Sequence, residues 1–194
     1  MTTVTLSLKP FIDRISETDL EQLCQENPEA RLETNAEGQL IIMSPTGSES
    51  GKFNISLAAQ VWNWNNQTKS GIVFDSSTGF KLSNGAVRSP DVSWVAIDKW
   101  NSLSKQQQRK FAPIAPNFVI ELMSPTDELS ELQNKMKEYM ECGIELGWLI
   151  NPDEKQVEIY RQQEEPEILN NPQTLLGEHI LPDLIIDLQD IFGH

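Results

Sequence analysis

A run of apolar residues that contains a single carboxylate constrains this chain most. Residues 117–123 read Asn-Phe-Val-Ile-Glu-Leu-Met, and Glu121 is the one charged side chain among them. An apolar run of this length predicts a central β-strand buried on both faces. An ionised carboxylate in such a strand is costly unless it is paired or bound to a metal ion. Glu121 is therefore expected to face a metal ion or other partner, and an ion pair with Lys or Arg at the strand end is the alternative.

A second carboxylate stands at the start of another predicted strand. Asp91 directly follows a Ser-Pro pair and begins the predicted strand 91–97. If the two strands are neighbours, Asp91 and Glu121 place four oxygens around one point, which suits a hard divalent cation such as Mg²⁺. The backbone carbonyl of Leu122 can add a ligand. A simple turn or strand-start role for Asp91 is the alternative, and the sequence does not choose between the two.

Two predicted helices carry the remaining candidate residues. Apolar residues recur at helical spacing over residues 48–68, where the stripe consists of Phe53, Leu57, Ala58, Val61 and Trp62. A second helix covers 128–142, with a stripe of Leu129, Leu132, Met136 and Met140. Lys135 and Lys137 flank that stripe on opposite sides, and helical geometry does not choose between them. Glu49 is placed on the inward side of the first helix, and a first-turn carboxylate that complements the helix dipole is the alternative.

The rest of the chain predicts short elements that complete one α/β domain with a mixed sheet. The predicted elements are a helix over 16–27, a hairpin of strands 30–34 and 39–43, strands 71–75 and 79–82, a short helix 98–104, an exposed loop 105–109, and strands 147–150 and 157–161. We expect a single domain over 1–194 with its core at about 19–192.

The charge is strongly asymmetric along the chain. It has 15 Lys and Arg against 29 Asp and Glu, a formal net charge of −14, which excludes a uniformly basic nucleic-acid coat. Residues 52–110 differ, because they carry eight basic and three acidic side chains. Solvated surface charge is one interpretation of this segment, and a local positive surface that faces a polyanion is the other.

Several classes of protein are excluded by what the sequence lacks. No apolar run approaches the ~18 residues of a membrane span, and the N-terminus has no secretion-signal pattern. The only cysteines, Cys24 and Cys142, are not in a Cys-x-x-Cys motif, so the cytoplasm is the expected compartment. His179 and His194 are the only histidines, which argues against a His-based catalytic triad.

Several motifs together resemble those of a known family. They are Arg88-Ser-Pro-Asp-Val, Phe118-Val-Ile-Glu-Leu-Met-Ser-Pro, Lys135-Met-Lys-Glu-Tyr, Gly147-Trp-Leu-Ile-Asn-Pro, Met43-Ser-Pro-Thr-Gly-Ser-Glu-Ser-Gly and Leu181-Pro-Asp-Leu. From about residue 19 to 192 the chain resembles the Uma-two family of small bacterial restriction-endonuclease-like proteins, within the PD-(D/E)XK nuclease superfamily. The resemblance implies an α/β fold with a mixed central β-sheet flanked by helices.

The resemblance also implies roles for individual residues. Asp91 matches the first acidic position of the superfamily and Glu121 the second, with the Leu122 carbonyl beside them as a metal ligand. The usual lysine two residues after the second acid is replaced here by Met123, and the family pattern points to Lys135 on the following helix instead. Glu49 matches an acid that some of these nucleases carry on the first core helix, as a catalytic residue and metal ligand.

The activity implied by the resemblance is hydrolysis of phosphodiester bonds in DNA with Mg²⁺ or Mn²⁺ as cofactor. Arg88 would contact the phosphate backbone, and the basic segment 52–110 would bind nucleic acid without regard to sequence. A homodimer would suit the cutting of two strands. The alternative is a catalytically silent nuclease fold that serves as a binding or assembly module.

Overall fold

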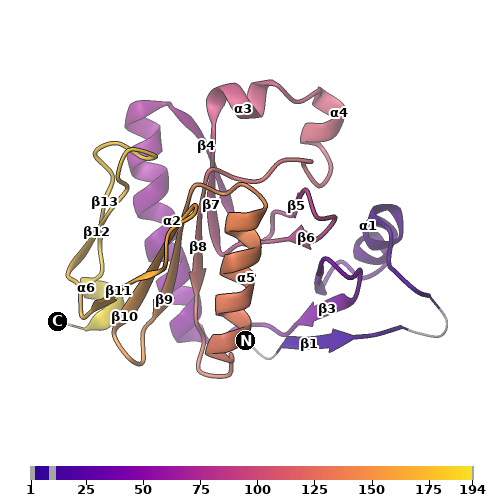
Figure 1. The fold of residues 1–194 in the computed structure, drawn as a ribbon, viewed down its shortest axis with the longest axis horizontal. Helices are drawn as coiled ribbons and strands as arrows, with labels where there is room; N and C mark the ends of the chain where they lie inside the picture. The colour runs from indigo at the N-terminus through magenta and orange to yellow at the C-terminus, as the bar shows by residue number, and fades with distance from the viewer. Residues whose placement is uncertain (1–2, 9–11, 194) are drawn as a thin grey trace.

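The computed structural model describes residues 3–8 and 12–193 and is built around two larger β-sheets (Figure 1). The first has six strands in the order β11–β10–β9–β8–β7–β4. Their bounds are β4 Gly71–Asp75, β7 Val92–Ala96, β8 Phe118–Leu122, β9 Leu146–Asn151, β10 Gln156–Arg161 and β11 Glu167–Asn170. Strands β8 and β9 pair in parallel, whereas the other neighbours are antiparallel. The predicted mixed sheet is confirmed.

The second sheet is antiparallel, and its described strands run in the order β1–β3–β2–β6–β5. Their bounds are β1 Thr3–Leu6, β2 Arg31–Thr34, β3 Leu40–Met43, β5 Phe80–Lys81 and β6 Val87–Arg88. The predicted hairpin joins β2 to β3, and Gly38 in its turn has a φ of 73°, a value that favours glycine. β1 was not predicted, because a four-residue edge strand gives little periodic signal.

Two helices cover the two faces of the six-stranded sheet (Figure 1). Helix α2 (Ser48–Thr68) packs with Phe118, Ile120 and Leu122 in one core cluster, and α5 (Leu129–Glu141) packs with Val119 in another. Side chains alternate between the faces along a strand, so Glu121 lies on the α5 side of β8. All five residues of β8 are buried, which confirms the predicted central strand.

The apolar stripe of α2 differs from the prediction at its C-terminal end. Phe53, Leu57 and Val61 are buried as expected, but Trp62 is 55% exposed and Trp64 is buried instead. The indole N–H of Trp64 donates to the backbone carbonyl of Pro182 at 2.8 Å. Both tryptophans lie near the helical stripe, and this long-range hydrogen bond helps to hold the second one inward.

The remaining elements surround the sheets. They are α1 (Glu17–Glu26), α3 (Ile97–Asn101), α4 (Lys105–Gln108), β12 (Thr174–Leu176), β13 (Ile185–Asp187) and α6 (Gln189–Phe192). Most of residues 105–109 are exposed as predicted, but they do not form a loop, because a capping box between Ser104 and Gln107 supports the short polar helix α4. Among the described residues, no helix has both the length and the apolar character that a bilayer crossing requires.

Candidate active site

A cavity of about 670 Å³ opens where the two sheets meet helix α5. Of the predicted site residues, Arg88, Asp91, Glu121, Leu122 and Lys135 line this cavity. Side chains from both sheets and from α5 therefore converge on one open space, as the sequence analysis required.

Asp91 is fixed beside β8 by two hydrogen bonds. The antiparallel pairing of β7 with β8 brings Asp91 next to Leu122, whose N–H donates to Asp91 Oδ2 at 2.9 Å. The side-chain amide of Asn54, from α2, donates to Asp91 Oδ1 at 3.2 Å. Burial raises the pKa of Asp91, although the Leu122 N–H and the charge of Lys135 oppose the shift.

Glu121 is 4% exposed and contacts two side chains of α5. The ammonium group of Lys135 lies 2.9 Å from Glu121 Oε1, and the hydroxyl of Tyr139 donates to the same oxygen at 2.7 Å. Burial raises the pKa of Glu121 to about 7; Lys135 opposes this shift, whereas the charges of Asp91 and Glu33 add to it. The acid in the central strand thus has an ion-pair partner and lies within electrostatic reach of two other carboxylates.

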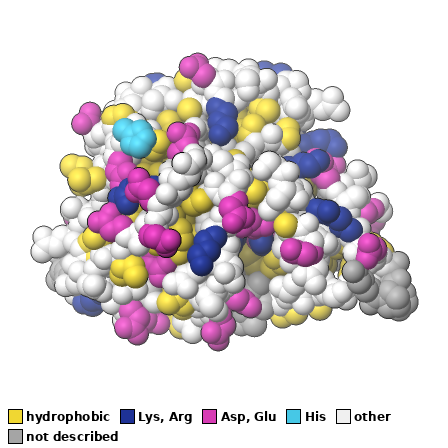
Figure 2. Space-filling model, viewed as in Figure 1, with side chains coloured by type: hydrophobic (Ala, Val, Ile, Leu, Met, Phe, Trp, Pro, Cys, Tyr) yellow, Lys and Arg dark blue, Asp and Glu magenta, His cyan; other side chains and the backbone are white. Residues whose placement is uncertain are grey.

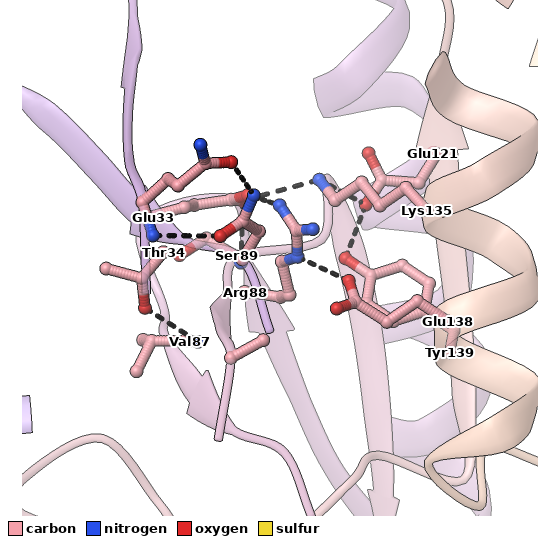
Figure 3. Close-up of polar contacts among 12 residues, drawn as sticks. Glu33, Thr34, Val87, Arg88, Ser89, Glu121, Lys135, Glu138 and Tyr139 are labelled. Carbon is pink, nitrogen blue, oxygen red and sulfur yellow. Dashed lines mark hydrogen bonds and ion pairs between the residues drawn. The ribbon is translucent and has the colours of Figure 1, made fainter. Parts of the chain in front are cut away.

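Glu33, which the sequence analysis missed, occupies the centre of the polar network (Figure 3). It is 1% exposed on β2, and the Ser89 N–H donates to its Oε1 at 2.8 Å. The same oxygen lies 3.3 Å from Lys135 Nζ, and Glu33 Oε2 lies 3.2 Å from a terminal nitrogen of Arg88. Burial would raise the pKa of Glu33, but the charges of Lys135 and Arg88 outweigh it, and the pKa is lowered.

Arg88 is buried within this network (Figure 3). Pairing of β2 with β6 at Thr34 and Val87 brings Arg88 beside Glu33, and its Nε also contacts Glu138 of α5 at 2.7 Å. Burial disfavours the charged guanidinium, yet the two glutamates raise the pKa of Arg88 above its usual value. This geometry favours a structural link between the second sheet and α5, and the predicted phosphate contact of Arg88 receives no support from it.

The structure separates the two candidate lysines. Lys135, Glu138 and Tyr139 share one face of α5 because residues three and four apart are neighbours on a helix, and this face contacts Glu33, Arg88 and Glu121. Lys137 is exposed at the cavity wall and makes no ion pair with a described residue. Lys135 is thus the lysine that the structure brings to the acidic pair.

Glu49 does not reach this cavity. It lies in the first turn of α2 and is exposed, so the inward placement expected from the sequence is wrong. The α2 residue that lines the cavity is Asn54, five positions later. Its Oδ1 is buried and accepts no hydrogen bond from a described residue, while its amide nitrogen contacts Asp91. An unsatisfied oxygen beside a carboxylate is a signal that only the structure could give.

The cavity has an acidic lining. Nine acidic and four basic side chains line it, and the acids beyond Glu33, Asp91 and Glu121 are Glu37, Asp127, Glu128, Glu131, Glu138 and Glu141. Such a surface repels a polyanion unless cations screen it.

Basic side chains of the 52–110 segment gather elsewhere. Lys105, Arg109 and Lys110 line a second cavity of about 780 Å³ between α4 and α1, where Glu21 is the one acidic lining residue. Figure 2 shows several Lys and Arg side chains on the right of the view, over the region between these two helices. The basic segment thus contributes to a local positive surface, but Arg88 is its one basic side chain that lines the acidic cavity.

Asp91 and Glu121, together with the neutral Asn54 beside them, provide oxygen atoms of the kind that bind a divalent cation. No group of three His, Cys, Asp or Glu side chains in the described residues is arranged to hold a metal ion. Asp91 and Glu121 supply two carboxylates at the cavity, and Asn54, whose buried Oδ1 accepts no hydrogen bond from a described residue, lies beside Asp91. Oxygen donors of this kind suit Mg²⁺ or Mn²⁺, which also keep water ligands.

The fold of this chain is similar to that of a solved crystal structure. The fold matches a crystal structure described as that of "a putative nuclease belonging to DUF820" from Anabaena variabilis ATCC 29413, with a TM-score of 0.75 and 22% sequence identity. The match covers 92% of this chain and 98% of that one. At this identity the likeness shows the fold alone, which is the mixed central sheet flanked by helices that the sequence predicted.

The family follows from the sequence itself. The chain belongs to the Uma2 family, described as "Putative restriction endonuclease", whose profile matches residues 18–189. The family predicted from the sequence motifs is confirmed. No curated protein matches the chain significantly. Membership of this family supports a nuclease-like function.

Proposed function

We propose that this protein is a divalent-metal-dependent nuclease that hydrolyses phosphodiester bonds, with DNA as the expected substrate. The observation that carries the proposal is the convergence of Asp91, Glu121 and the ammonium of Lys135 on one open cavity. Two carboxylates can hold a divalent ion that assists phosphodiester hydrolysis, and a neighbouring cation can stabilise the charge of the transition state. Membership of a nuclease family and a nuclease fold support the same conclusion.

Each residue has a distinct task in the proposed reaction. Asp91 and Glu121, with the Leu122 carbonyl and Asn54 Oδ1 as neutral ligands, would hold Mg²⁺ or Mn²⁺. When bound, the ion would activate a water molecule and neutralise charge on the scissile phosphate. Lys135 would stabilise the negative charge that develops on the phosphate oxygens. Tyr139 orients Glu121 by its hydrogen bond, and Asn54 and the Leu122 N–H orient Asp91.

Nucleic acid is proposed to bind over both cavities. The acidic cavity would accept a phosphate only with its metal ions, whereas the basic cavity at Lys105, Arg109 and Lys110 would contact the sugar–phosphate backbone through charge. We therefore expect binding that depends on divalent ions and weakens steeply with added salt. The homodimer and the cytoplasmic location stay predictions.

A cleavage assay tests the function directly. Purified protein is incubated with supercoiled DNA, single-stranded DNA and RNA in Mg²⁺, Mn²⁺ or EDTA, beside a Glu121→Gln variant prepared identically. We expect cleavage of at least one substrate by the wild type in a divalent ion, and none in EDTA or by the variant. Equal cleavage by both proteins, or by neither on every substrate, would overturn the proposal.

Substitutions of Asn54 and Glu49, both on α2, are expected to affect Mn²⁺ affinity differently. Replacing Asn54 with Leu removes the amide and should weaken Mn²⁺ binding by roughly 10-fold or more, the usual range for a lost supporting contact at a metal site. Glu49→Gln should leave Mn²⁺ affinity within about twofold, because its side chain is exposed outside the cavity. Titration followed by Mn²⁺ electron paramagnetic resonance measures both. Greater weakening by Glu49→Gln would restore the assignment made from the sequence.

A catalytically silent module is the second candidate, and one observation favours it. Lys135 already neutralises Glu121 in the structure, so the acidic pair is partly compensated by the chain itself. Under this alternative neither Mg²⁺ nor Mn²⁺ would bind at the cavity. A rise in melting temperature with either ion that disappears in Glu121→Gln would exclude it.

A further inference from the structure

We propose that Glu33 is a positioning residue that accepts the ammonium of Lys135 when a divalent cation occupies the site at Asp91 and Glu121. The inference rests on the proposed function and extends it to a residue that the resemblance does not assign. Its basis is that one ammonium group lies between two buried carboxylates from different sheets (Figure 3).

The present geometry shows Lys135 shared between its two partners. Lys135 Nζ lies 2.9 Å from Glu121 Oε1 and 3.3 Å from Glu33 Oε1. The shorter distance is to the carboxylate that the proposal assigns to the metal. A small rotation of the lysine side chain would bring its ammonium closer to Glu33 and farther from Glu121 without moving the backbone of α5.

Glu33 is held in place independently of Lys135. Its Oε1 accepts the Ser89 N–H at 2.8 Å, and its Oε2 contacts Arg88 at 3.2 Å. Arg88 is in turn fixed by Glu138, at 2.7 Å from its Nε. Glu33 therefore has fixed partners of its own in the network, whereas the ammonium of Lys135 contacts both carboxylates and can favour either one.

Competition between cations gives Glu33 its proposed role. A divalent ion and the Lys135 ammonium would compete for the carboxylate of Glu121, because two cations close to one carboxylate repel each other. A second carboxylate within reach lowers the cost of moving Lys135 aside, because the buried ammonium keeps an anionic partner. Glu33 would thus favour metal binding through Lys135 and keep the ammonium beside the cavity, where it can act on a phosphate.

A double-mutant cycle on Mn²⁺ affinity tests this role without any measurement of cleavage. Glu33→Gln should weaken Mn²⁺ binding by about 10-fold, because Lys135 then stays with Glu121. Lys135→Met should strengthen binding, because the competing cation is gone. Glu33→Gln in the Lys135→Met background should then leave the affinity within about twofold, since Glu33 acts through the missing lysine. Calorimetry or paramagnetic resonance with Mn²⁺ alone supplies the affinities.

The outcomes separate this inference from the proposed function. An equal fall for Glu33→Gln in both backgrounds would mean direct attraction of the metal by Glu33, and would overturn the inference while metal binding stands. Absence of Mn²⁺ binding by the wild type would overturn the proposed function as well.

Two further variants control for the charge of the cavity and for loss of the fold. Glu131→Gln removes an exposed carboxylate from the wall of the same cavity, so it should bind Mn²⁺ as the wild type does. A fall like that of Glu33→Gln would attribute the effect to the net charge of the cavity and overturn the role of Glu33. Glu33→Asp keeps the charge but moves the carboxylate away from Lys135. If Glu33→Gln does not fold, Glu33→Asp replaces it in the cycle. We then expect a smaller fall in Mn²⁺ affinity, and only when Lys135 is present.

Discussion

Glu121→Gln is expected to reduce metal-dependent cleavage by at least ~10³-fold, because the amide cannot provide the anionic ligand and loses the ion pair with Lys135. The comparison is Glu131→Gln, which removes an exposed carboxylate from the wall of the same cavity and should change the rate by less than about twofold. Single-turnover cleavage rates measure both. Similar losses in the two variants would show that the net charge of the cavity, and not Glu121, controls the rate.

The same variant should also change how stability depends on pH. With the pKa of Glu121 raised from 4.5 to about 7, the folded protein keeps a proton between these values that the unfolded chain releases. The wild type therefore loses stability as the pH rises through this window, by about 3 kcal/mol from this group. Glu121→Gln cannot titrate and should show a smaller fall. Urea unfolding in EDTA at pH 5 and pH 7.5 measures the change in unfolding free energy of each protein. An equal change in the wild type and in Glu121→Gln would contradict the raised pKa.

Arg88→Met is expected to cause the largest loss of stability, about 3–5 kcal/mol, because it removes a buried cation. The substitution leaves Glu138 without its ion pair and leaves Lys135 as the one cation that pairs with Glu33 among the described residues. For a chain of this size the loss corresponds to a fall in melting temperature of roughly 10 °C. Thermal unfolding followed by circular dichroism measures it.

A second arginine provides the matched control. Arg161 also contacts two glutamates, Glu167 at 2.8 Å and Glu178 at 2.6 Å, but its side chain is 23% exposed and Glu167 is 49% exposed. Partly exposed ion pairs contribute less than buried ones, so Arg161→Met should cost about 1 kcal/mol, well below the loss expected for Arg88→Met. Equal losses for the two arginines would mean that burial of the Arg88 network does not determine its contribution.

The fold was largely predictable where the hydrophobic pattern is long and regular. The strand around Glu121 and the helix that carries Lys135 are marked by apolar runs and stripes whose period depends only on local geometry. The proximity of Asp91 to Glu121 followed from the assumption that their strands are neighbours, which the pairing of β7 with β8 confirms.

The rest of the site depends on contacts that no local pattern contains. Glu33 lies on a four-residue strand, 102 positions from Lys135 in sequence, so only the meeting of two sheets reveals the pair. Glu49 keeps the helical phase of Phe53, but it precedes the first buried residue of α2, Ser50, and remains exposed. The helical phase of Glu49 was predicted correctly, but the first turn of α2 is not yet packed against the sheet at this residue.

A crystal soaked in Mn²⁺ would show whether a metal ion binds in the acidic cavity. We predict an anomalous peak within ligand distance of the carboxylates of Asp91 and Glu121, with the Lys135 ammonium displaced toward Glu33. Crystals of Glu121→Gln soaked in the same way should show no peak there. An empty cavity in the wild type, with Lys135 still at Glu121, would contradict the proposed metal site and the nuclease activity built on it.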